Sequence, residues 1–107
     1  MQFDVVVAGA GPAGISTAVA LVRRDPSLKK RIVVLDRARF PREKPCGGGL
    51  TGHAGEAMAA LGLELTVPSV PSPRAEVRVG EFRREVALGR PVHVILRDDF
   101  DASLVAQ

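Results

Sequence analysis

The stretch of residues 3–14 constrains the fold of this chain most, because it joins an apolar run directly to a glycine turn. Residues 3–8 are rich in valine and contain a single acid, which is typical of a strand covered on both faces in a parallel sheet. Gly9, Gly11 and Gly14 follow with the spacing Gly-x-Gly-x-x-Gly. Such a turn lets a nucleotide pyrophosphate approach the backbone at the start of a helix.

A helix is expected directly after the turn, starting at Pro12, where the missing N–H of proline costs nothing. Apolar residues recur at helical spacing through residues 13–22, and basic residues follow them. The helix is therefore expected to end near Arg24, with Pro26 after it. Residues 31–36 hold four consecutive apolar residues and an acid, which predicts a second strand. Two parallel strands joined by this helix form one right-handed βαβ unit.

Asp36 closes the second strand and stands 22 positions after Gly14. A carboxylate at the carboxyl end of this strand accepts hydrogen bonds from both ribose hydroxyls of an adenosine, and it repels a 2′-phosphate. The strand, the turn, the helix and the acid together predict a bound dinucleotide, FAD or NAD and not NADP. The alternative interpretation is an ordinary turn for the glycines and a surface acid for Asp36.

Residues 38–51 are expected to form a loop, because they contain two prolines followed by three glycines at 47–49. These glycines either let the backbone approach a flat ligand ring or form a flexible linker. A short helix is expected over residues 50–61, with Thr51 as its N-cap and a glycine as its stop.

The second half of the chain has the pattern of an antiparallel hairpin. Residues 74–79 alternate apolar and charged side chains, as a half-exposed strand does, and Gly80 with Glu81 can make a two-residue turn. The expected elements are an irregular segment at 63–73, strands at 74–79 and 82–88, a close of the hairpin at 89–91, a strand at 92–96, and a helix from Arg97 with acids in its first turn.

These elements predict an α/β fold, in which a Rossmann-like βαβ FAD-binding unit has an incomplete parallel sheet and an inserted antiparallel β-hairpin. The predicted division assigns residues 1–62 to a FAD/NAD(P)-binding unit and residues 63–91 to a crossover and hairpin of a substrate domain. Residues 92–107 are expected to form a return strand and the start of a helix of the FAD-binding domain, truncated.

Composition narrows the class of protein. Apolar residues make up 46% of the chain and charged residues 25%, as in ordinary globular proteins. The net charge is +3, and residues 23–44 hold nine basic and three acidic residues. This segment is a solvated basic face, or it attracts cofactor phosphates or anionic lipid headgroups. Nucleic acid is not an expected partner, because the chain has no Trp or Tyr and only Phe40 lies in the basic segment to stack on a base.

The single cysteine, Cys46, excludes an internal disulfide and fits a reducing compartment. Because no basic leader and no apolar run of membrane-spanning length is visible, a cytoplasmic protein, or one resting on a membrane surface, is expected. His53 and His93 have no second histidine or carboxylate at metal-ligand spacing, so no metal site is expected.

Three segments resemble one known family. They are the turn at residues 9–14, the segment at 36–51 with its Pro-Cys-Gly-Gly-Gly run, and residues 97–104, Arg-Asp-Asp-Phe-Asp-Ala-Ser-Leu. Together they resemble the N-terminal part of the geranylgeranyl reductase family, within the wider group of flavoproteins folded like para-hydroxybenzoate hydroxylase. The Pro-Cys-Gly-Gly-Gly run is the most specific part. Family members are several times longer and carry a second FAD motif containing Gly-Asp, so the resemblance implies a truncated chain.

The resemblance implies FAD as the cofactor. It places the pyrophosphate at the glycine turn, the adenosine ribose at Asp36 and the adenine end beside Arg37. It places the flavin ring or the substrate path beside the cysteine and the glycines that follow it. The residues implied in cofactor binding are Gly9, Gly11, Pro12, Ala13, Gly14, Asp36, Arg37, Cys46, Gly47, Gly48 and Arg97.

Two of these residues have a structural alternative. Arg97 is implied to contact the cofactor near its phosphates, where a guanidinium can fork onto phosphate oxygens. Its alternative is a local ion pair with Asp98, Asp99 or Asp101. The alternative for Cys46 is an unreactive loop thiol. No catalytic residue is assigned within the chain.

The resemblance implies a FAD-dependent oxidoreductase that reduces isoprenoid double bonds, with NAD(P)H or another donor reducing the flavin. A flavin monooxygenase or halogenase is the alternative among enzymes. The alternative of another class is a non-catalytic nucleotide-binding remnant, because an incomplete sheet leaves the apolar faces of residues 5–7 and 33–35 with few partners. The expected partner is a small isoprenoid or lipid-like substrate, with peripheral membrane contact left open.

Overall fold

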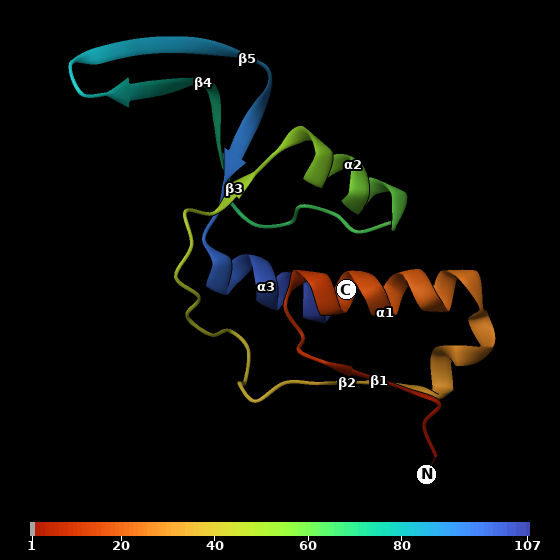
Figure 1. The fold of residues 1–107 in the computed structure, drawn as a ribbon. Helices are drawn as coiled ribbons and strands as arrows, with labels where there is room; N and C mark the ends of the chain where they lie inside the picture. The colour runs from red at the N-terminus through yellow and green to blue at the C-terminus, as the bar shows by residue number, and fades with distance from the viewer. Residues whose placement is uncertain (1) are drawn as a thin grey trace.

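The computed structural model describes residues 2–107, which form an elongated body of 60 × 26 × 24 Å. Figure 1 shows helices gathered above a small parallel sheet and a long β-hairpin that projects away from them. The elements are β1 (Val5–Ala8), α1 (Pro12–Arg24), the 3-10 helix η1 (Pro26–Lys30), β2 (Ile32–Leu35), β3 (Gly49–Leu50), α2 (Gly52–Ala60), β4 (Val70–Val79), β5 (Phe82–Val94) and α3 (Arg97–Ala106). The predicted α/β class is confirmed.

β1 and β2 form a parallel pair in which Val5 lies opposite Ile32. α1 joins the two strands and packs against both, so the predicted βαβ order is confirmed. The expectation that these strands are covered on both faces is wrong within residues 2–107. Val6 is 58% exposed and Leu35 is 56% exposed, because the described chain covers only the α1 side of this sheet.

β4 and β5 form the projecting hairpin, which turns at Gly80 with a φ of +58°. Its charged face is tied by ion pairs, among them Arg74 Nη1 to Glu85 Oε1 at 2.8 Å. The segment at 89–91 was expected to close the hairpin, but β5 continues through it to Val94. The register shifts at this place, because Ser72 pairs with Val92 but Arg74 pairs with Ala87, which leaves residues 88–91 of β5 without partners in β4. The predicted break is therefore present as a bulge within β5 and not as the end of the strand.

β3 was not expected, and it changes where the next helix begins. Gly49 and Leu50 pair with the end of β5, so α2 starts two residues later than predicted. The predicted N-cap is confirmed, because Thr51 Oγ accepts a hydrogen bond from the Ala54 N–H at 3.3 Å. Gly62, with a φ of +71°, follows the helix as predicted.

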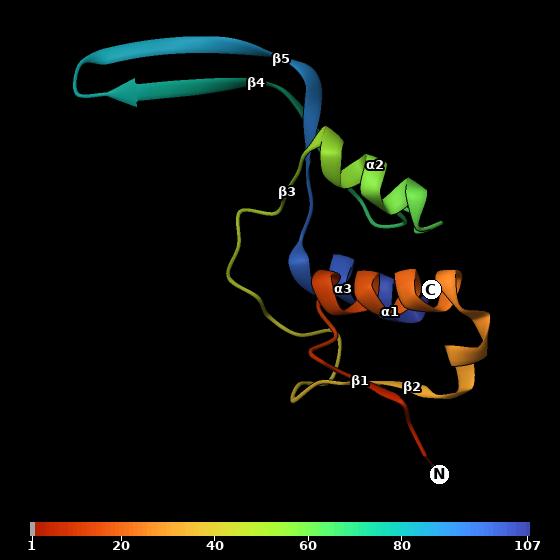
Figure 2. The same ribbon diagram turned by 45° about the vertical axis from the view of Figure 1, so that its right-hand side comes forward.

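The core lies among the helices and not on the parallel sheet. Its buried residues are Leu63, Ile95, Phe100 and Leu104, and partly buried residues of α1 and α2 pack against them. In both Figure 1 and Figure 2, α3 lies beside α1, although the two helices stand at opposite ends of the chain. Burial of α3 therefore holds the start of α1 in place. No helix within residues 2–107 has the length and apolar character needed to cross a bilayer.

Candidate functional site

The N-terminus of α1 stands at the carboxyl end of β1, where Rossmann-like folds bind a dinucleotide. Gly14 packs tightly on this turn, since a Cβ added there would lie 1.8 Å from the carbonyl oxygen of Gly9. Gly11 is the N-cap, and because glycine has no side chain, no cap hydrogen bond occupies the N–H groups of the first turn. The first N–H groups of a helix have no intrahelical partner, and they carry the positive end of its dipole. The turn therefore offers an anion-binding helix terminus.

Asp36 lies beside this turn, at the end of β2. Its Oδ2 accepts a hydrogen bond from the Ala10 N–H, and its Oδ1 accepts one from the Ala38 N–H, both at 2.8 Å. The bond from Ala10, then the bond from Ala38 and the charges of Arg42 and Arg37 lower the pKa of the Asp36 carboxyl. The carboxylate is exposed, so each oxygen still has a lone pair to offer to a ribose hydroxyl.

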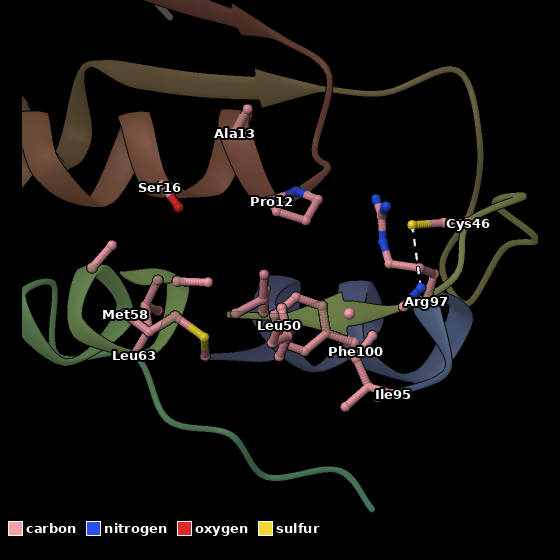
Figure 3. A pocket seen from close by; sticks show the side chains of 15 residues that line it. Pro12, Ala13, Ser16, Cys46, Leu50, Met58, Leu63, Ile95, Arg97 and Phe100 are labelled. Atoms are coloured by element: carbon pink, nitrogen blue, oxygen red, sulfur yellow. Dashed lines mark hydrogen bonds between the residues drawn. The ribbon is translucent and has the colours of Figure 1, made fainter. Parts of the chain in front are cut away.

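A cavity of about 520 Å³ opens at the ends of β1 and β2 and is lined by Ala8, Gly9, Leu35, Asp36 and Arg37. A second cavity, of about 360 Å³, lies on the other side of the α1 N-terminus, between α1, α2 and α3 (Figure 3). Its lining is largely apolar and includes Pro12, Ala13, Ser16, Cys46, Gly48, Leu50, Met58, Leu63, Ile95, Arg97 and Phe100. Two hollows thus flank the glycine turn, as an extended dinucleotide would need.

Gly48 fixes the loop that closes the second cavity. Its φ is +71°, and a Cβ there would lie 2.0 Å from the carbonyl oxygen of Ile95. The Ile95 N–H donates a hydrogen bond to the Gly48 carbonyl at 2.9 Å. Only glycine allows this close approach of two backbones. The run of glycines is therefore a packed contact at this position and not a free linker.

Cys46 lies at the mouth of the same cavity, with its thiol exposed. The Gly48 N–H donates a hydrogen bond to its sulfur at 3.4 Å. This bond, and next the neighbouring Arg97 guanidinium, lower the pKa of the Cys46 thiol. A thiol with these partners has more thiolate character than the unreactive loop thiol considered as its alternative.

Cys46 is expected to react with iodoacetamide several-fold faster at neutral pH in the folded chain than in the same chain unfolded in urea. The thiolate is the nucleophile, and a lowered pKa places the rise of the reaction rate at lower pH. Mass spectrometry across a pH series measures this midpoint. Arg97→Gln should move the midpoint upward by only part of the difference, since the Gly48 bond remains. Equal midpoints for the folded and unfolded chains would contradict the assigned environment.

Arg97 forms the local ion pair that was considered as the alternative to cofactor binding, with Asp101 as its partner. Its Nε and Nη2 donate hydrogen bonds to Asp101 at 2.8 and 2.9 Å, and this pairing raises the pKa of Arg97. Asp101 is completely buried and also faces Arg42, whose Nη1 lies 2.8 Å from Asp101 Oδ2. Two guanidinium groups therefore share one buried carboxylate beside the α1 N-terminus. Nη1 of Arg42 is buried beside Asp101 and pairs with it by charge, although it forms no hydrogen bond within residues 2–107.

The structure separates the predicted cofactor residues into two groups around the turn. Asp36 and Arg37 lie at the first cavity, while Cys46, Gly48 and Arg97 lie at the second. Gly47 lines neither of these cavities and is exposed. Gly9, Gly11, Pro12, Ala13 and Gly14 form the turn between them. Contact of these residues with a cofactor stays a prediction, and the chemistry of the donors fits an anionic dinucleotide.

Sequence reasoning missed one residue and undervalued another. Arg42 did not stand out, because it is one of nine basic residues in its segment. Asp101 was considered only as one of three acids near Arg97, although its spacing of four residues from Arg97 favours a helical ion pair. Within residues 2–107, no three His, Cys, Asp or Glu side chains gather to hold a metal ion.

Comparison with known proteins gives relatives for about half of the chain. No family model matches. Over 60 residues, 56% of this chain, it is 48% identical to a menaquinone reductase of Mycobacterium tuberculosis and 47% identical to one of Mycolicibacterium smegmatis. An uncharacterized protein of Methanosarcina barkeri is 47% identical over 53 residues, which are 50% of this chain and 13% of that protein. The chain spans about 14% of the length of the two mycobacterial relatives.

A solved structure extends the similarity to nearly the whole chain. The flavin-dependent brominase Bmp2 matches 97% of this chain, which corresponds to 26% of the brominase chain, with a TM-score of 0.77 and 26% sequence identity. The chain is therefore similar to flavin-dependent oxidoreductases in both sequence and fold.

Proposed function

We propose that this chain supplies the FAD-binding unit of a flavin-dependent reductase that saturates isoprenoid double bonds, as in the geranylgeranyl reductase family. The observation that carries the proposal is the 48% identity with a protein named menaquinone reductase. Menaquinone is a quinone with an isoprenoid tail, so a prenylated quinone belongs to the proposed substrate class. When bound, FAD reduced by NAD(P)H or another donor supplies hydride to an alkene.

The residues of the chain bind and orient the cofactor in this proposal. The glycine turn and the N–H groups of α1 hold the pyrophosphate, and Asp36 holds the adenosine ribose with Arg37 beside the adenine. Cys46 and Gly48 line the apolar cavity proposed for the flavin end, and Gly47 lies between them in the loop. Arg97 contacts the cofactor near its phosphates in this proposal, and its ion pair with Asp101 keeps its guanidinium at the cavity wall.

A lipid-like substrate also favours contact with a membrane surface. The basic residues of α1 and η1 that lie away from the glycine turn, Arg23, Arg24, Lys29 and Lys30, are exposed and suited to anionic headgroups. A flavin-dependent monooxygenase or halogenase is the second candidate, and the fold similarity to a flavin-dependent brominase favours it.

Anaerobic turnover tests the proposed reaction. The chain is incubated without O₂ with FAD, dithionite and a prenylated quinone, and the product is examined by mass spectrometry. We expect a mass gain of one or more hydrogen pairs in the tail, because the reductase needs no O₂. No product without O₂, and an oxygenated or halogenated product once O₂ is admitted, would instead support the second candidate. A chain that binds no FAD in a fluorescence titration would support a non-catalytic role.

A further inference from the structure

We infer that Arg42 binds the diphosphate of the dinucleotide and that Asp101 positions its guanidinium for this contact. The inference rests on the proposed FAD-binding function and adds a residue to the same site. It is carried by the place of Arg42, which lies in the loop between β2 and β3 and yet reaches the start of α1.

The guanidinium of Arg42 stands over the anion-binding end of α1. Its Nη2 lies 3.5 Å from the position that a Cβ on Gly11 would take. Gly11 is the N-cap, and a diphosphate bound at a Rossmann-like turn lies against this first helical turn. Nη2 and the free N–H groups of α1 therefore converge on one place.

Two contacts hold the guanidinium there, and one of the partners is itself fixed by Arg97. Its carbon lies 4.8 Å from the centre of the Phe40 ring, and its Nη1 lies 2.8 Å from Asp101 Oδ2. Asp101 is in turn bonded through both oxygens to Arg97. The Arg42 side chain is only 18% exposed, so its orientation is set before any ligand arrives.

The charges around Asp101 do not balance. Arg42 and Arg97 carry two positive charges against the single negative charge of Asp101, and Nη1 of Arg42, although close to Asp101, makes no hydrogen bond within residues 2–107. A partly buried cation without a full partner is costly. An anion at the α1 N-terminus would compensate the excess charge and accept hydrogen bonds from Nη2 of Arg42 and from the first N–H groups of α1.

The test compares Arg42→Gln with Arg39→Gln, which removes the same charge from an exposed side chain three residues away. FAD affinity is measured by flavin fluorescence, and ADP and adenosine are measured as competitors. Arg42→Gln is expected to weaken FAD and ADP about 10- to 30-fold while adenosine is unaffected. It should also flatten the salt dependence of FAD binding, because one screened cation–phosphate contact is lost. Arg39→Gln should change neither quantity by more than about twofold.

A second variant and a folding measurement keep the test decisive. Arg42→Lys retains a cation beside Asp101 but not the forked geometry, so an intermediate loss of ADP affinity with unchanged circular dichroism is expected. Equal losses for Arg42→Gln and Arg39→Gln, or a fall in adenosine affinity as large as that for ADP, would overturn the inference. If the unaltered chain bound neither FAD nor ADP, the proposed function would fail and the inference would fall with it.

Discussion

Replacing Gly14 with alanine is expected to lower the free energy of unfolding by about 3 kcal/mol and to remove measurable FAD binding. The added Cβ would lie 1.8 Å from the carbonyl oxygen of Gly9 and 2.9 Å from its carbonyl carbon. Both are backbone atoms, so the contact is relieved only if α1 moves away from β1 or the turn opens. The better helix propensity of alanine, about 1 kcal/mol, is too small to compensate. Urea denaturation followed by circular dichroism measures stability, and flavin fluorescence measures binding.

Gly55→Ala is the matched control for this substitution. Gly55 is exposed in α2, and a Cβ there would meet no atom within 4 Å. The same chemical change should therefore raise the free energy of unfolding by about 1 kcal/mol. The two variants are expected to have opposite signs. If Gly14→Ala were as stable as the unaltered chain, the close packing of α1 on the turn would be refuted.

Asp101→Asn is expected to cost about 3 kcal/mol of stability, because it removes the negative charge that two arginines share. Asp101 is fully buried, whereas the side chains of Arg97 and Arg42 are 19% and 18% exposed. Without the carboxylate the guanidinium groups, which have little access to water where they lie, would gain solvation by moving outward, and this movement would loosen α3 from the loop after β2. The change is nearly isosteric, so the effect reports charge and hydrogen bonding and not a cavity. Urea denaturation of the purified chain gives the free energy difference.

Asp99→Asn provides the comparison on the same helix. Asp99 lies in the first turn of α3 and is exposed, so its carboxylate interacts with the helix dipole through water-screened charge. Its loss should cost about 0.5 kcal/mol. Similar stabilities for Asp99→Asn and Asp101→Asn would show that the buried carboxylate contributes no more than a surface acid. High salt should reduce the effect of Asp99→Asn more than that of Asp101→Asn.

The elements that the sequence predicted well depend on neighbours in the chain. The strand, turn and helix at residues 3–24 follow from local apolar spacing, three glycines and a proline, and the structure has them in that order. The N-cap at Thr51 and the turn at Gly80 were likewise visible, because capping and positive φ concern a few consecutive residues. The division of the chain into domains and the contacts of a cofactor stay predictions.

The errors arose where distant segments meet. β5 was divided at 89–91 because Gly89 and Pro91 punctuate the sequence; the structure has a bulge there, and pairing with β4 on both sides of it makes one strand of the two parts. β3 was missed because two residues are too few to show the alternating hydrophobic pattern of a strand. They are a strand only because they pair with β5. The parallel strands were taken as buried on both faces from their valines, although a run of apolar residues cannot show whether a second layer is present.

The glycine turn can be located from the sequence alone, since Gly9 follows β1, Gly14 lies in the first turn of α1 and Asp36 follows β2. The charges that stand beside that turn became known only from the tertiary structure. Asp101 lies 59 positions from Arg42, and the two meet because burial of Phe100 and Leu104 docks α3 against the core. Contacts of this kind depend on how apolar side chains pack in the core, and the order of charged residues along the chain does not predict that packing.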